Sequence, residues 1–146
     1  MAARLWPLVA VLLAAGCVGR PARDAPARVP APPTTLSLQS ELPPGAALSV
    51  AWATLRRSGW PLGAATATTL TTGWNETAAG PVRLFVMASE VGGGASTALS
   101  VWGETRGDDG GPVAIDRPDP VGPAGPWEVV EKAARRVQAE VRYARP

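Results

Sequence analysis

The stretch that decides the fold is residues 82–105, which reads VRLFVMASEVGGGASTALSVWGET. Val82–Ser89 and Thr97–Thr105 are rich in β-branched and aromatic residues and carry apolar side chains at alternate positions, a pattern typical of β-strands. Between them, Glu90–Ser96 contains three consecutive glycines, which readily take the positive φ values that a turn needs. The stretch therefore predicts an antiparallel hairpin.

The two faces of this hairpin differ in character, because successive side chains of a strand point to opposite sides of a sheet. The side that we expect the helices to cover takes Leu84, Val86, Leu99 and Val101. The opposite side takes Phe85, Met87 and Trp102. We predict that these three large side chains stay uncovered and form an interaction surface. One alternative is that the loop at residues 106–126 folds back over them with Val113, Ile115 and Val121. The other is that the strand register is shifted by one residue, which would exchange the two faces.

Three further elements are expected around the hairpin. Apolar residues at helical spacing predict a first helix from Pro44 to Ser58, and a threonine-rich run predicts a strand from Ala65 to Trp74. Trp127–Arg142 carries one apolar stripe, made of Trp127, Val130, Ala134, Val137 and Val141, and predicts the last helix. The predicted fold class is α+β: helix, three-stranded antiparallel sheet and helix, in two layers.

This order of elements resembles the helix-grip-like domains of bacterial envelope lipoproteins, including the outer-membrane-protein assembly lipoprotein C family. The residues behind the resemblance are the strand end Thr71–Trp74 and the alternating strands Val82–Ser89 and Thr97–Thr105. It extends over about residues 44–142. The resemblance implies a scaffold or accessory role at the cell envelope, without catalysis.

The N-terminus has the three parts of a signal peptide, predicted over residues 1–16. Arg4 supplies a positive charge, Leu5–Ala15 is apolar, and small residues lead into Cys17. The apolar run has eleven residues, too few to span a bilayer as a helix. Leu13–Cys17 resembles a lipobox, with Ala14 where the family usually has leucine, which implies lipidation of Cys17. The alternatives are an ordinary secretory signal with a chance cysteine, or an uncleaved anchor.

Residues 17–35 are predicted to form the lipidated cysteine and a tether, followed by a single domain over 36–146. Five prolines fall between residues 18 and 35 without apolar periodicity, which favours an extended, semi-rigid chain. The residue after Cys17 is Val18 and not aspartate. By resemblance to Gram-negative lipoproteins, this implies the outer membrane as the location.

Composition excludes several classes of function. The chain has no histidine, a single cysteine and a formal charge of +2, so neither a zinc site nor nucleic-acid binding is expected, and we predict no cofactor. Four aspartates without EF-hand spacing lie in a proline- and glycine-rich loop, so no metal site is predicted; they are Asp108, Asp109, Asp116 and Asp119. Glu90 and Glu104 fall at strand ends, and paired carboxylates can catalyse glycoside hydrolysis, but charges at strand ends are common on sheet surfaces. No enzyme is predicted.

The function expected from the sequence is therefore that of a membrane-anchored envelope lipoprotein. It would be non-enzymatic and would act as an accessory or scaffold protein, with the membrane and another envelope protein as its partners. The alternative is a binding module that takes a small apolar ligand or cell-wall glycan on the open face of its sheet.

Overall fold

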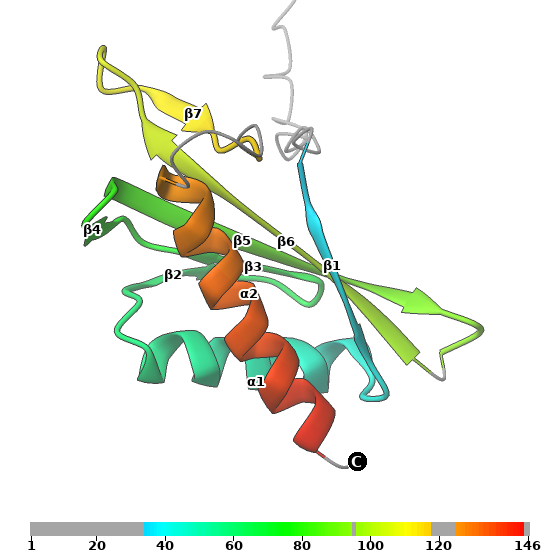
Figure 1. Cartoon of the computed structure of the whole chain (residues 1–146). Coiled ribbons are helices and arrows are strands. Elements are labelled where there is room, and N and C mark those ends of the chain that lie inside the picture. The colour runs from blue at the N-terminus through cyan, green and yellow to red at the C-terminus, as the bar shows by residue number, and fades with distance from the viewer. Residues whose placement is uncertain (1–33, 95, 118–124, 145–146) are drawn as a thin grey trace, which may run out of the picture. The chain divides into compact units, whose positions relative to one another are not determined.

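The centre of the sheet is the hairpin of β5 (Gly80–Val91) and β6 (Ser96–Arg106), seen in a computed structural model that describes residues 34–94, 96–117 and 125–144 (Figure 1). The two strands pair antiparallel in continuous register from Val82 opposite Thr105 to Val91 opposite Ser96. At the turn, Gly92, Gly93 and Gly94 all have positive φ. The predicted hairpin is confirmed, and both strands are longer than expected.

Five shorter strands extend this hairpin into a seven-stranded antiparallel sheet with the path β1-β6-β5-β3-β2. They are β1 (Leu36–Ser40), β2 (Leu62–Ala65), β3 (Thr69–Thr72), β4 (Asn75–Thr77), which pairs with β5, and β7 (Pro112–Ala114), which pairs with β6. The α+β class is confirmed, whereas the three-stranded sheet is wrong. The missed strands have at most five residues, which is too short for a clear alternation signal.

The predicted strand at Ala65–Trp74 is in fact interrupted. The Thr66 hydroxyl accepts a hydrogen bond from the Thr69 backbone N–H at 3.0 Å, and the Thr66 N–H donates to the Thr69 carbonyl at 2.8 Å. These bonds form a turn, as threonine and serine side chains often do. The turn reverses the chain between β2 and β3.

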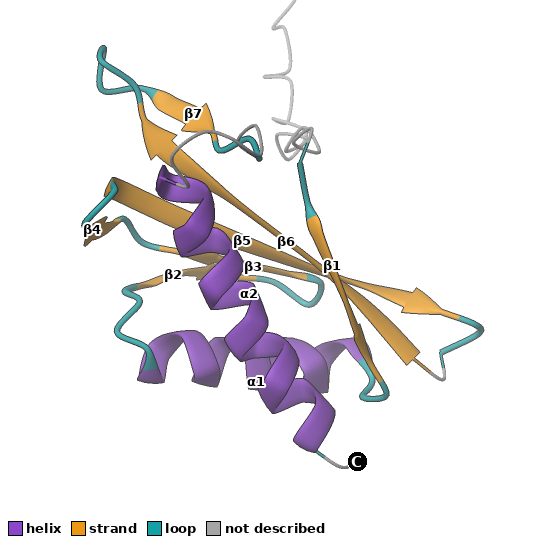
Figure 2. Ribbon diagram, in the orientation of Figure 1, coloured by secondary structure: helices purple, strands orange, loops and turns teal. Residues whose placement is uncertain are grey.

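Two helices pack on the same face of the sheet, as expected, and Figure 2 shows both on one side of the strands. Helix α1 (Pro44–Arg57) starts at a proline, which is well tolerated in the first turn. It ends before Gly59, whose φ of 86° reverses the chain. Helix α2 (Gly125–Tyr143) buries the whole predicted stripe from Trp127 to Val141. Neither described helix has the length and apolar composition needed to cross a membrane.

The core lies between these helices and the sheet. The four predicted core residues of the hairpin, Leu84, Val86, Leu99 and Val101, are all essentially inaccessible to solvent. Ile115, just after β7, is also buried in this helix-side core. It therefore does not cover the opposite face, contrary to the alternative reading of the loop at 106–126. Val113 is exposed, and Val121 lies outside the described residues.

Candidate interaction surface on the open sheet face

The face turned away from the helices is built from cross-strand pairs of β5 and β6. Arg83 lies opposite Glu104, Phe85 opposite Trp102, and Met87 opposite Ser100. The third strand of this face is β3, whose Thr71 and Thr69 lie beside Phe85 and Met87. Directly opposite residues have closely spaced side chains, so the register brings the three predicted interaction residues together.

Phe85 and Trp102 are nevertheless not left uncovered. Their rings stack with centroids 5.3 Å apart and an interplanar angle of 6°. Phe85 is 9% exposed and Trp102 only 7%, while Met87 is 39% exposed. The expectation that all three stay uncovered is therefore wrong for the two aromatic residues. The strand period placed them on the correct face but did not predict that the two rings would stack and be buried.

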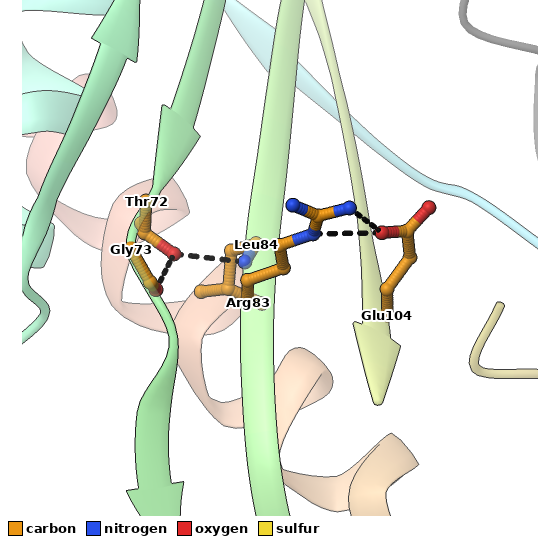
Figure 3. A network of polar contacts seen from close by, with 5 residues as sticks. All are labelled: Thr72, Gly73, Arg83, Leu84 and Glu104. Atoms are coloured by element: carbon orange, nitrogen blue, oxygen red, sulfur yellow. Dashed lines mark hydrogen bonds and ion pairs between the residues drawn. The ribbon is translucent and has the colours of Figure 1, made fainter. Parts of the chain in front are cut away.

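Arg83 adds a second layer to this pair. Its guanidinium carbon lies 5.3 Å from the centroid of the Phe85 ring and 4.7 Å from that of Trp74. Its Nε and Nη2 both contact Glu104 Oε2, at 2.7 and 2.6 Å (Figure 3). A planar guanidinium can stack on rings and bind a carboxylate at the same time. Arg83 thereby joins three side chains of the open face.

Trp74 reaches this cluster because β3 ends at Thr72. The Thr72 hydroxyl accepts a hydrogen bond from the Leu84 N–H and donates one to the Gly73 carbonyl, each at 2.9 Å (Figure 3). The Thr72 hydroxyl thus accepts the hydrogen bond of a β5 backbone N–H at the point where β3 ends. Arg106 also lies over Trp74, with its guanidinium carbon 4.9 Å from the ring centroid.

We call this group the aromatic–arginine cluster; it consists of Trp74, Arg83, Phe85, Trp102, Glu104 and Arg106. Sequence reasoning assigned only its two central aromatic residues to an interaction surface, and it singled out Glu104 for a different reason, as a carboxylate. The cation–ring contacts join positions up to 32 residues apart, as in the contact between Trp74 and Arg106. No local spacing rule links such positions.

The stacking role of Arg83 predicts that Arg83→Lys destabilises the domain by about 1 kcal/mol although it keeps the charge, because lysine has no planar group to stack. The matched control is Arg135→Lys on α2, whose ion pair with Glu131 is exposed and is expected to change stability by less than about 0.5 kcal/mol. Urea denaturation followed by circular dichroism measures both. Equal effects of the two substitutions would contradict the stacking role.

The remaining acidic candidates do not form a catalytic or metal-binding group. Glu90 lies opposite Thr97 and Glu104 opposite Arg83, so the two carboxylates stand at opposite ends of the hairpin. Asp109 accepts a hydrogen bond from the Gly111 N–H at 2.9 Å and serves the turn before β7. Within residues 34–94, 96–117 and 125–144, no three potential metal ligands gather.

Cys17, the predicted lipidation site, lies outside the described residues. No protein-family model matches the chain, and no curated protein matches it either.

Proposed function

We propose that this chain is a membrane-anchored lipoprotein of a bacterial envelope that acts without catalysis as an accessory or scaffold protein. The observation that carries the proposal is the apolar run Leu5–Ala15 with the lipobox-like Leu13–Cys17. A diacylglycerol on Cys17 supplies two acyl chains, and two chains anchor a protein stably where one is marginal. The resemblance to outer-membrane lipoproteins favours the outer membrane as the location.

Lipidation of Cys17 is tested by metabolic labelling with a palmitate analogue. The wild-type chain should be labelled and recovered with membranes, whereas Cys17→Ser should lack the label and accumulate as an unprocessed precursor. The physical reason is that only the thiol can form the thioether on which signal cleavage depends. Equal labelling of the two chains would refute the lipid anchor.

Binding to another envelope protein is supported by the exposed part of the open face. Met87 protrudes between Ser100 on β6 and Thr69 on β3, both of which have shorter side chains. Val91, farther along the same side of β5, is also 39% exposed. Methionine adapts its shape readily to a partner. Binding of a glycan is less favoured. A sugar could stack on the ring of Trp74, but the guanidinium groups of Arg83 and Arg106 already lie over that ring.

A photoreactive side chain placed at position 87 should crosslink the chain to a discrete envelope protein in living cells. The matched control is position 132 on the exposed side of α2, where no such product is expected. Gel mobility and mass spectrometry identify the products. The same protein captured from both positions, or only glycan captured from position 87, would contradict the proposed partner surface.

A further inference from the structure

Strand β1 forms one end of the sheet path, and among the described residues it pairs with β6 alone. The backbone of such an edge strand offers unpaired N–H and C=O groups on its outer side and can serve as a template for another chain. Proteins therefore blunt or cover their sheet edges. In this chain the outer side of β1 carries a specific contact from helix α2.

Gln138 supplies this contact with both ends of its side-chain amide. The Gln39 backbone N–H donates to Gln138 Oε1 at 3.2 Å, and Gln138 Nε2 donates to the Gln39 carbonyl at 3.1 Å. In an antiparallel sheet, a residue of a hydrogen-bonded pair exchanges both of these bonds with the residue opposite. The Gln138 amide thus occupies the place of the next strand.

The surroundings hold Gln138 in this position. Val137 and Val141 on the same helix are buried in the core, which fixes how α2 lies against β1. Beside Gln138, a groove of about 270 Å³ lies between Leu36 and Leu38 of β1 and side chains of α2 that include Arg135 and Arg142. Within this groove the Gln138 amide holds the outward N–H and C=O groups of Gln39.

We propose that Gln138 caps the β1 edge and keeps it from pairing with the β1 edge of a second copy of this chain. The edge is self-complementary: an antiparallel pair centred on Leu38 would place Gln39 of each copy opposite Ser37 of the other. Residues 17–35 lead directly into β1, so the same length of chain would separate this edge from the anchor in every copy; this point alone rests on the proposed lipid anchor.

The test is sedimentation velocity of the full chain in detergent, over a range of protein concentrations. Gln138→Met keeps the shape of the side chain and removes both hydrogen bonds. We expect its dimer dissociation constant to be at least about tenfold lower than that of the wild type, because two wild-type copies must give up four Gln138–Gln39 hydrogen bonds to pair and the variant gives up none. Gln138→Glu keeps an acceptor for the Gln39 N–H and adds charge at the edge, so it should stay monomeric.

Two further variants decide whether β1 is the surface involved. Lys132→Met adds the same apolar side chain to the exposed side of α2 and should stay monomeric. Adding Gln39→Pro to Gln138→Met removes the outward N–H and should restore the monomer, because proline is tolerated where an edge N–H faces outward. A monomeric or unfolded Gln138→Met, association of Lys132→Met, or association that Gln39→Pro does not reverse would overturn the proposal.

The comparison is repeated with Cys17→Ser in every chain. If Gln138 caps the edge, the variants should rank the same by dimer dissociation constant with and without the lipid. A failure of the lipid anchor would therefore leave this test intact, and a failure of the cap would leave the proposed anchor intact.

Discussion

Trp102→Ala is expected to lower the free energy of unfolding by about 3–5 kcal/mol, the cost typical of removing a buried large aromatic side chain. Trp102 is 7% exposed and stacks on Phe85, so alanine at this position loses the burial of its own ring and uncovers its neighbour. Urea denaturation followed by circular dichroism measures the loss without relying on the fluorescence of the other tryptophans. The effect is expected although Trp102 lies on the face away from the helices.

The matched control is Met87→Ala on the same face. Met87 is 39% exposed, so its replacement should cost less than about 1 kcal/mol, as is usual for surface positions. A similarly small loss for Trp102→Ala would show that the stacked pair contributes little to the fold.

Gly103→Val is expected to be the second severe substitution, because α2 packs directly on the bare backbone of β6. A Cβ atom added at Gly103 would lie 2.7 Å from Val130 Cγ2, 3.2 Å from Ile115 Cδ1 and 3.3 Å from the Arg83 carbonyl oxygen. Val130 is fully buried, so its side chain cannot turn away into solvent. Overpacking of this kind typically costs about 1–3 kcal/mol, and the two further methyl groups of valine place it at the upper end or beyond.

Two comparisons make this test specific to steric contact. The Cβ atom that Gly45→Ala adds on α1 meets no atom within 4 Å. This substitution should stabilise the chain by up to about 1 kcal/mol, because alanine has a higher helix propensity than glycine. Val130→Ala introduced together with Gly103→Val should recover part of the loss, since it removes the nearest atom. Additive losses in the double variant would show that the contact with Val130 is not the cause.

The hairpin and the helix stripes were predictable because their signals are local. The alternation of apolar side chains along β5 and β6 predicted that Leu84 and Leu99 face the helices. The helical spacing of apolar residues from Trp127 to Val141 predicted the position of α2. In each case, residues close in the sequence repeat with the period of one element. Such a pattern can be recognised in the sequence even when the packing partner of the element is unknown.

The candidate site was predictable only in part, for the same reason. Alternation identified the face that carries Phe85, Met87 and Trp102, but not which of them other side chains would cover. The two rings stack on one another and Arg83 lies over Phe85, contacts that the strand register brings about. These contacts depend on which strands are neighbours, and alternation within one strand is the same whatever its neighbours are.

By itself, the sequence determined the α+β class, the two helices, the central hairpin and the side of the sheet that is buried, because each follows from a short repeating pattern of apolar side chains. The tertiary structure alone decided the seven-stranded sheet, the aromatic–arginine cluster and the contact of Gln138 with Gln39, two residues that are 99 positions apart. Short edge strands and single polar contacts carry no period of their own. They form only where the packed helices and the long hairpin bring distant parts of the chain within hydrogen-bonding distance.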